Sequence, residues 1–430
     1  MDFAPSARAA DLSTRVRQFI DHQIEPIEAE VVADIAARRA RGADPWRVDP
    51  RIERLKDLAR GEGLWNLFLP AGHEGPYAVR FGTDGGVGLS NLDYAPVAEQ
   101  MGRSLLAPLI FNSNAPDTGN MEVLLKYGSQ SQKDRWLEPL LDGTIRSTFL
   151  MTEPAVASSD ATNMAATALV DGDWERGTGE VVLNGRKWWS SGAGHPDCRV
   201  GIFMALTDPD ADRHHRHSMV LVPMDHPGVR VERMLSTLGQ FDEPLGHGEV
   251  TLTDVRLPID HIIAGPGRAF EIAQGRLGPG RVHHCMRLIG LSEKSLDLAL
   301  ERATTRTAFG KPLANLGGNR ERLARARIAI NQARLHVLHA AWKLDTYGSA
   351  GALSEVSEIK AAVPSMACEV IDLAIQLHGG GGTGPDFPLA AAYAGARSLR
   401  LADGPDEVHL GVVSRMMLAP YAARSPRQGR

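Results

Sequence analysis

The spacing of apolar residues changes twice along this chain of 430 residues, and one repeating element cannot accommodate both spacings. Up to about residue 146, apolar side chains recur three and four positions apart, as in amphipathic helices. From about 147 to 260 the spacing becomes two, as in Cys198–Leu206, which is typical of strands. The helical spacing returns from Gly265 onward. The chain therefore predicts an α+β fold with a β region between two helical regions.

We expect three domains, because the chain is too long for one ordinary core. They are an N-terminal helical domain (1–146), a middle β domain (147–262) and a C-terminal helical bundle (263–430). The expected helices are 11–37, 49–64, 91–104, 130–141, 266–306, 318–346, 353–378, 389–401 and 406–418. Strands are expected to include 198–206 and 218–223, with turns at Asp171-Gly172 and Asn184-Gly185.

Bulk composition excludes several classes of function. A formal net charge of -5 provides no basic field for wrapping nucleic acid. The three cysteines, Cys198, Cys285 and Cys368, are far apart and form no Cys-x-x-Cys pair, so we expect neither disulfides nor a metal site, and a cytoplasmic location. No signal-peptide pattern and no run of 18 uncharged apolar residues is present, so we expect no membrane span.

A short apolar run beginning at Phe149 ends in a dense group of small polar residues. This group comprises Thr152, Ser158, Ser159, Asp160, Thr162 and Asn163. One turn residue suffices to end a strand, so the excess of hydroxyl and amide groups needs a reason. They could cap the loop itself, or they could converge on an anion or a heteroaromatic ring. The residues alone leave both interpretations open.

Two adjacent tryptophans, Trp188 and Trp189, precede Ser190 and Ser191. Large flat rings beside small hydroxyl residues suit a flat ligand such as an isoalloxazine ring. The alternative is a sheet that carries one tryptophan on each face.

Five glycines lie between Gly379 and Gly384, directly after an expected helix. A helix C-cap followed by a turn explains one or two of them, and the others would let backbone approach a ligand closely. The segment is not a dinucleotide-binding fingerprint, because it follows a helix and not a strand.

Acidic residues gather near the C-terminus, at Asp403, Asp406 and Glu407, with His409 close by. A carboxylate beside Gly404 and a proline could be held rigidly at a ligand, or the group could bind a metal. Asp406 and Glu407 also fit the first turn of a final helix. The pair His283-His284 has no carboxylate near it in the sequence, which favours a place in a pocket wall or core over a metal site.

Taken in order, these segments resemble the acyl-CoA dehydrogenase family of flavoproteins over essentially the whole chain. The resemblance rests on Met151-Thr-Glu-Pro, Ser159-Asp, Asn184-Gly to Trp189 and Ser191, Arg306-Thr-Ala-Phe-Gly-Lys, Gln376-Leu-His-Gly-Gly and Asp403-Gly. Ala115-Pro-Asp-Thr-Gly-Asn-Met, Leu277-Gly-Pro-Gly-Arg-Val-His-His and Ala402-Asp-Gly-Pro-Asp-Glu-Val-His are similar to the branch that contains the animal family members ten and eleven. Those animal proteins carry a further kinase-like domain, which we do not expect within these 430 residues.

The resemblance implies noncovalently bound FAD, with its ring between the middle domain and the C-terminal helices. Thr152 and Trp189 would line the ring, and Ser159 would lie where the flavin and the CoA pantetheine meet. The neighbouring subunit of a dimer, or of a dimer of dimers, would contact the adenosine diphosphate half through Arg306, Phe309, Gln376 and Gly380. The implied cofactor-binding residues are Phe149, Met151, Thr152, Ser158, Ser159, Trp189, Ser190, Ser191, Arg306, Phe309, Gln376, Gly379, Gly380, Pro405 and Glu407. The implied substrate contacts are Ser159, Arg281 and Gly404.

The implied catalytic base is Asp403, which would take the α proton of an acyl thioester while a hydride leaves the β carbon. Most of the family has glutamate at this position, and aspartate is shorter by one methylene, roughly 1.5 Å of reach. The alternative family position for the base is Gly280 here, which has no side chain to act. An apolar site would raise the pKa of Asp403 towards working pH. Pro405, Glu407 and Gly317 depart from side chains that are common in the family, so the flavin contacts there are open.

The predicted function is therefore that of an FAD-dependent acyl-CoA dehydrogenase that forms trans-2-enoyl-CoA and passes electrons to an electron-transfer flavoprotein. A second hypothesis is a flavin oxidase of the same fold, because nitroalkane oxidases resemble this family and use an aspartate base. A third is a non-catalytic relative that binds nucleic acid, which the acidic balance of the chain disfavours. The length of the acyl chain cannot be read from the sequence.

Overall fold

The computed structural model describes residues 2–69 and 88–422. It divides into two compact units, neither of which is continuous in sequence. The helical unit comprises Met1–Arg17, Ser90–Leu105 and Arg281–Arg430, and the sheet unit comprises Gln18–Leu89 and Leu106–Gly280. The predicted division into three consecutive domains is a different partition, and it stays a prediction.

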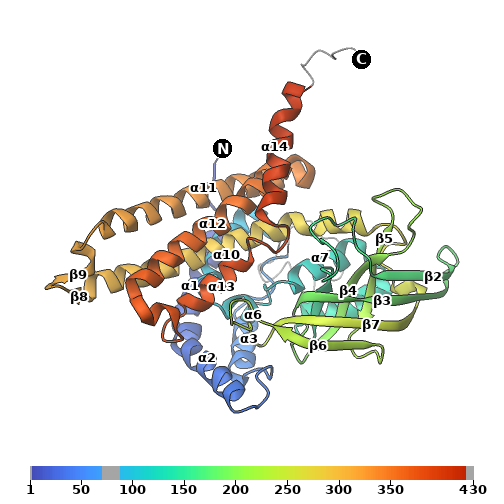
Figure 1. The fold of residues 1–430 in the computed structure, drawn as a ribbon, viewed down its shortest axis with the longest axis horizontal. Helices are drawn as coiled ribbons and strands as arrows, with labels where there is room; N and C mark the ends of the chain where they lie inside the picture. The colour runs from blue at the N-terminus through green and yellow to red at the C-terminus, as the bar shows by residue number, and fades with distance from the viewer. Residues whose placement is uncertain (1, 70–87, 423–430) are drawn as a thin grey trace. The chain divides into compact units, whose positions relative to one another are not determined.

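Long helices build the helical unit, as the three-and-four spacing predicts. They are α1 (Ala7–Phe19), α5 (Asn91–Met101), α10 (Ala269–Thr305), α11 (Asn319–Gly351), α12 (Leu353–His378), α13 (Leu389–Ser398) and α14 (Asp406–Ala422), of which α1 and α10 extend into the sheet unit. The two-residue strands β8 (Thr307–Ala308) and β9 (Lys311–Pro312) form a hairpin at the end of the α10–α11 pair (Figure 1). No helix among the described residues is long and apolar enough to cross a membrane.

Two glycines let α5 and α10 cross in backbone contact. A Cβ atom on Gly102 would lie 1.9 Å from the carbonyl oxygen of Arg287, and one on Gly290 would lie 1.8 Å from that of Glu99. Any other residue at either position would force the helices apart. The crossing therefore sets which turn of α10 faces α5.

The sheet unit is built on strands with the predicted spacing of two. They are β1 (Arg146–Leu150), β2 (Thr167–Asp173), β3 (Thr178–Ser191), β4 (Cys198–Leu206), β5 (His217–Pro223), β6 (Val229–Leu235) and β7 (His247–Pro258). Their order across the sheet is β1-β4-β2-β3-β7-β6, and β5 pairs with β4. β1 runs parallel to β4, whereas β3 is antiparallel to both β2 and β7. Buried side chains such as Leu183, Phe203 and Val250 form the core of this unit.

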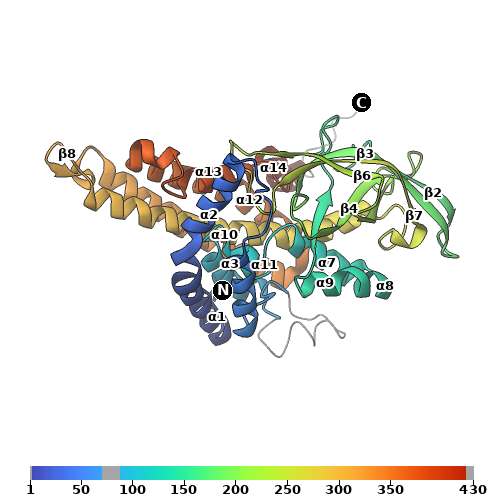
Figure 2. The ribbon, with the colours of Figure 1, turned by 90° about the horizontal axis from the view of Figure 1, so that it is seen from below.

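Short helices complete the sheet unit, and α7, α8 and α9 lie together on one side of the sheet (Figure 2). The helices are α2 (Glu25–Ala40), α3 (Pro50–Gly61), α6 (Ala107–Ile110), α7 (Asp117–Tyr127), α8 (Gln130–Gln132) and α9 (Glu138–Leu141). A π-helical turn (Ile20–Ile24) interrupts the expected helix 11–37, and another (Lys133–Leu137) interrupts 130–141.

Both predicted turns are wrong. Gly172 pairs with Gly179 inside the β2–β3 ladder, and a Cβ on either residue would meet the other's Cα within 2.6 Å. Gly172 is therefore required by close approach between strands, and the chain reverses at residues 174–177. Asn184-Gly185 lies within β3, where the register with β7 shifts. Gly185 permits that bulge, since a Cβ there would meet the Cβ of Ala166 at 2.4 Å.

Candidate active site

A buried ion pair anchors the start of the polar segment that follows β1. The ammonium of Lys187 donates to a carboxylate oxygen of Glu153 at 2.7 Å and to the carbonyl oxygens of Met151 and Met204. Glu153 also accepts from the backbone N–H groups of Ala165 and Ala166. Burial lowers the pKa of Lys187 to about 8, and the charge of Glu153 opposes that shift. Lys187 thus ties the beginning of the segment to β3 and β4, and Glu153 ties that beginning to the residues that follow the segment.

The polar residues of this segment divide between the two roles that the sequence left open. Ser158 accepts from the N–H of Glu153, while Asp160 accepts from both the N–H and the hydroxyl of Thr162, so these side chains stabilise the loop. The hydroxyls of Thr152 and Ser159 make no hydrogen bond to any described residue. Those two groups remain available to a ligand.

The double tryptophan lies where the β3–β7 register shifts between Lys187 and Ser190. Trp189 adopts a φ of 52°, and 41% of its surface is exposed. The N–H of Trp188 donates to the carbonyl oxygen of Thr152 at 2.9 Å, which joins this bulge to the polar segment. The indole of Trp189 is therefore partly exposed next to a bulge whose backbone is bonded to Thr152.

A histidine that the motif analysis missed completes this group. Nδ1 of His247 lies 2.9 Å from the hydroxyl of Ser191, and the ring of His247 lies 5.9 Å from that of Trp189. Burial lowers the pKa of His247, against the raising effect of Asp242.

This part of the sheet unit has the properties that a flavin requires. It offers an exposed indole as an apolar flat surface and hydroxyls at its edge. The indole N–H of Trp188 and the hydroxyl of Ser190 are buried and have no hydrogen-bond partner within the described residues. Buried donors in native proteins are normally paired, so these orphaned groups indicate an absent polar partner such as a ligand or an ordered water.

In the helical unit, Asp403 lies in the turn between α13 and α14 in a strained backbone conformation. Its φ is 56°, and that of Gly404 is 100°. A Cβ on Gly404 would lie 3.0 Å from Nε2 of His409. A non-glycine residue with positive φ is held there only when its surroundings over-determine it. Such residues cluster at functional sites, which supports the prediction that Asp403 has a chemical role.

Three basic side chains hold the Asp403 turn through its backbone. The carbonyl oxygen of Asp403 accepts from Nε of Arg281 at 3.2 Å and from Nε2 of His409 at 3.2 Å. Lys360 of α12 donates to the carbonyl oxygens of Leu399 and Gly404. Burial lowers the pKa of both Arg281 and Lys360. Burial, with the charges of Arg281 and Lys360, lowers the pKa of His409 to about 4, so this ring is neutral at pH 7.

The carboxylate of Asp403 faces a histidine that is remote in sequence. Nε2 of His284 lies 3.3 Å from Oδ2 of Asp403. This carboxylate neighbour is absent from the sequence around His284, because Asp403 is remote in the chain. His283, by contrast, is buried and packs edge-on against Tyr94 with ring centroids 4.8 Å apart, as a core histidine does.

The implied cofactor-binding residues of the helical unit include four for the adenosine diphosphate half, namely Arg306, Phe309, Gln376 and Gly380, and most of them are exposed. Arg306 and Phe309 are on the β8–β9 hairpin, and Phe309 is 95% exposed. Gln376 is exposed near the end of α12, and Gly379 and Gly380 follow it with open space where a Cβ would be. Glu407 is exposed in the first turn of α14, and Pro405 precedes that helix.

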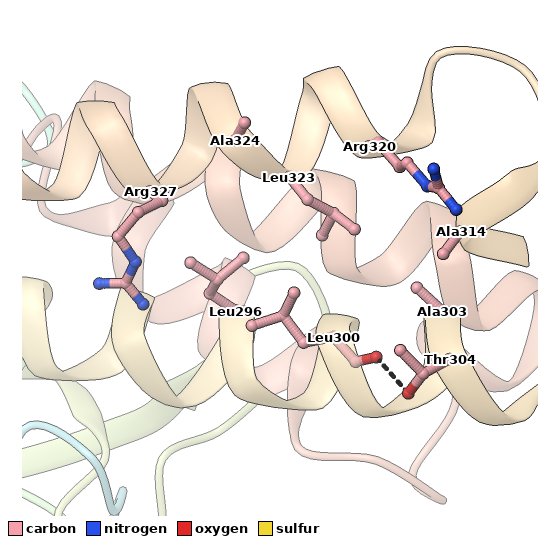
Figure 3. Close-up of a pocket in the computed structure, with 9 residues that line it drawn as sticks. All are labelled: Leu296, Leu300, Ala303, Thr304, Ala314, Arg320, Leu323, Ala324 and Arg327. Carbon is pink, nitrogen blue, oxygen red and sulfur yellow. Dashed lines mark hydrogen bonds between the residues drawn. The ribbon is translucent and has the colours of Figure 1, made fainter.

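An apolar pocket of about 400 Å³ lies between α10 and α11 (Figure 3). Its lining residues are Leu296, Leu300, Ala303, Thr304, Ala314, Arg320, Leu323, Ala324 and Arg327. The leucines point into the gap, and the hydroxyl of Thr304 donates to the carbonyl oxygen of Leu300. None of these nine residues is acidic, so this pocket does not hold the proton acceptor that the predicted reaction needs.

Three models of one protein family match successive parts of the chain. The acyl-CoA dehydrogenase N-terminal domain matches residues 6–144, the middle domain 148–255 and the C-terminal domain 267–418. The chain belongs to the acyl-CoA dehydrogenase family.

Similarity to individual family members is high. The chain is 50% identical over 424 residues to acyl-CoA dehydrogenase family member 11 of Mus musculus, a match that covers 98% of this chain and 52% of that protein. It thus spans about half the length of that relative. It is 46% identical over 420 residues to the probable acyl-CoA dehydrogenase FadE2 of Mycobacterium tuberculosis, with 97% of each chain covered. A solved Mycobacterium abscessus protein, provisionally designated an acyl-CoA dehydrogenase, is 65% identical with a TM-score of 0.90, covering 97% of this chain and 100% of that one.

Acyl-CoA dehydrogenases are FAD-dependent oxidoreductases, and more distant neighbours of the same fold, at 22% and 23% identity, include FAD complexes. The α+β fold and the family predicted from the sequence are therefore confirmed. Sequence reasoning missed the contributions of Lys187, His247, His284 and Lys360. Lys187 adjoins the double tryptophan and His284 belongs to the histidine pair, but nothing in the sequence around either residue marks its partner.

Proposed function

We propose that the chain is an FAD-dependent acyl-CoA dehydrogenase that oxidises an acyl-CoA to a trans-2-enoyl-CoA. The observation that carries this proposal is Asp403, a carboxylate held at positive φ, with its backbone fixed by Arg281 and His409 and its side chain against His284. A base that must meet one carbon–hydrogen bond needs such fixed geometry. FAD, when bound, supplies the acceptor for the hydride that leaves the β carbon.

Asp403 takes the α proton in this scheme, because Gly280, at the alternative family position, has no side chain to do so. Aspartate has less reach than the glutamate that is common in the family, so its placement depends more on the backbone of its turn. Arg281, Lys360 and His409 provide that placement through hydrogen bonds to the carbonyl oxygens of the turn. Arg281 and Gly404 are the proposed contacts to the acyl-CoA.

The flavin contacts in the sheet unit follow from the groups left unpaired there. Trp189 and Thr152 would line the ring, supported by the exposed indole and the unpaired hydroxyl. Ser190 and Ser191 would lie near the flavin, and Ser159 would contact both flavin and substrate. Phe149 and Met151 are proposed to contact the flavin through their backbone, next to Thr152. Ser158 is a weaker candidate, because its hydroxyl already accepts from the N–H of Glu153.

A neighbouring copy of the chain would complete the cofactor site. Arg306, Phe309, Gln376 and Gly380 are the proposed contacts across that interface, and Gly379 is a further proposed cofactor contact. The exposure of Phe309 supports this, since a phenyl ring that is 95% exposed gains from burial against a partner. We therefore propose a homo-oligomer, either a dimer or a dimer of dimers.

An electron-transfer flavoprotein is the proposed electron acceptor, as the family resemblance implies. The cytoplasm is the proposed location, because Cys198, Cys285 and Cys368 are all buried and unpaired, which fits a reducing compartment.

The test is anaerobic reduction of the FAD-loaded protein by a series of acyl-CoA substrates from butanoyl- to hexadecanoyl-CoA, followed by flavin absorbance. We expect at least one member of the series to bleach the flavin. Asp403→Asn should retain FAD and lose at least about 1,000-fold in the rate of reduction, because the base is removed while the binding contacts remain. Bleaching of Asp403→Asn at close to the parent rate would refute the assignment of the base.

Two further measurements on the same protein, oxygen consumption in air and DNA binding, separate the competing functions. Rapid oxygen consumption with nitroethane, and no bleaching with any acyl-CoA, would select the flavin oxidase. DNA binding that weakens with salt, without any flavin chemistry, would select the nucleic-acid-binding relative.

A further inference from the structure

Each ring nitrogen of His284 lies near a polar side chain. Its Nε2 lies 3.3 Å from Oδ2 of Asp403, and its Nδ1 lies 3.1 Å from Nη2 of Arg287, one turn further along α10. An arginine side chain can only donate hydrogen bonds, so Nδ1 of His284 is the acceptor in the second contact. The proton of a neutral imidazole is then on Nε2, directed at the carboxylate of Asp403.

Arg287 is itself held in place. Its side chain forms a hydrogen bond to Tyr94 of α5, and its backbone carbonyl oxygen lies at the glycine crossing of α5 and α10. Burial lowers the pKa of Arg287, but a guanidinium keeps its proton at any pH that the protein would encounter. The fixed donor on Arg287 therefore selects one tautomer of His284.

This arrangement makes His284 a donor and not a proton acceptor. A second proton would have to enter at Nδ1, which faces the guanidinium of Arg287. Two positive charges at that distance repel each other strongly in a partly buried site. The geometry thus favours His284 as a hydrogen-bond donor to Asp403 over a role as the acceptor of its proton.

The contacts around Asp403 divide by function. Arg281 and His409 hold its carbonyl oxygen, and Lys360 holds the carbonyl oxygens of Leu399 and Gly404, so these residues fix the backbone. His284 contacts the carboxylate itself. A short side chain on a fixed backbone still has rotational freedom, and a directed N–H restricts it.

We propose that His284, kept in its Nε2–H tautomer by Arg287, is a positioning residue that orients the carboxylate of Asp403 for removal of the α proton. This inference rests on the proposed function, in which Asp403 is the base.

Two substitutions at His284 test the directed hydrogen bond. His284→Gln keeps an N–H group that can reach the position of Nε2, whereas His284→Leu has a similar volume and no donor. The matched control is His336 of α11, whose Nε2 lies 3.1 Å from Oε2 of Glu358 in the same unit. His336→Leu and His336→Gln repeat the same chemistry away from Asp403.

The assay is anaerobic stopped-flow reduction of the FAD-loaded protein, with whichever of butanoyl-, octanoyl- and hexadecanoyl-CoA reduces the parent fastest. We expect His284→Leu to lower the limiting rate by about 10- to 100-fold, the usual effect of losing one hydrogen bond to a charged group. His284→Gln should recover most of that loss, and both His336 variants should match the parent. The isotope effect on the rate with the α-dideuterated substrate should rise in His284→Leu, because only the proton-transfer step is slowed. A change in folding or FAD content would not raise it.

Two results would overturn the proposal. One is a rate and an isotope effect for His284→Leu within twofold of the parent. The other is a rate for His284→Gln as low as that of His284→Leu, since volume alone would then account for the effect. Asp403→Asn, measured alongside, separates this inference from the proposed function. If Asp403→Asn is slow and His284→Leu is normal, only the role of His284 fails. If Asp403→Asn reduces at the parent rate, the proposed base fails and this inference fails with it.

Discussion

Gly290→Ala should separate α5 from α10 and destabilise the helical unit. The added Cβ would lie 1.8 Å from the carbonyl oxygen of Glu99, whereas real Cβ contacts are essentially never shorter than 3.0 Å. The two backbones must therefore move apart locally by about 1.2 Å, the difference between those two distances. A gap of that order removes about half of the dispersion attraction between facing atoms. Tyr94, Val97 and Met101 of α5 are at most 2% exposed and so depend on such packing.

The expected change in the free energy of unfolding combines overpacking with the higher helix propensity of alanine. Overpacking of a core typically costs about 1–3 kcal/mol, and replacing a glycine within a helix by alanine returns up to about 1 kcal/mol. We take the upper end of the cost, because the clash is between backbones, and expect a net loss of about 2 kcal/mol. In a unit of this size that lowers Tm by about 4–8 °C.

Gly395→Ala is the matched control, because Gly395 lies in α13, is exposed and would place its Cβ in open space. It should stabilise by up to about 1 kcal/mol. Both variants are compared with the parent by circular dichroism at 222 nm during heating, at one protein and one FAD concentration. Equal shifts in Tm for the two variants would refute the close crossing. The double variant Gly102→Ala/Gly290→Ala should lose less than the sum of the single losses, since one methyl already opens the space for the other.

Two further predictions concern buried charges. Lys187→Met should destabilise the sheet unit by about 3–5 kcal/mol in urea unfolding, because it leaves Glu153 charged and buried, and adding Glu153→Gln should recover part of that loss. A double variant less stable than Lys187→Met would contradict this. Burial also lowers the pKa of His195 and of His283 from 6.5 to about 3, so the unfolded chain takes up two protons before the folded one does. Each of these two histidines should lower the free energy of unfolding by about 1.4 kcal/mol per pH unit as the pH falls from 6 to 4, so His283→Gln should reduce the slope of stability against pH by about 1.4 kcal/mol per unit in acid-unfolding curves.

The helices were the most predictable part of the fold. The expected segment 353–378 coincides with α12, because a helix is recorded in the spacing of its own side chains. The turns were the least predictable. Gly172 and Gly185 carry the sequence signal of a reversal, yet both lie within strands where a neighbouring backbone or side chain leaves no room for a Cβ. From the sequence alone, a glycine required by close approach between strands cannot be distinguished from a glycine in a turn.

The cofactor could be predicted, and a candidate base proposed, only because several short motifs follow one another along the chain in the order that the family has. Met151-Thr-Glu-Pro, the double tryptophan and Asp403-Gly are short, ordered and shared with the family. The side chains that hold these motifs in place were not predictable from the sequence. Lys187 is separated from Glu153 by a strand and a loop, and no local sequence pattern indicates that the two side chains form an ion pair.

By itself, the sequence determined the class of elements, the family and the identity of the candidate base, because each depends on residues that are neighbours in the chain. The tertiary structure alone decided that His284 donates to Asp403, that Arg287 selects its tautomer, and that Trp189 is turned outward by a bulge. Hydrogen bonds and charge pairs act over about 3 Å in space, and that distance is unrelated to separation along the chain.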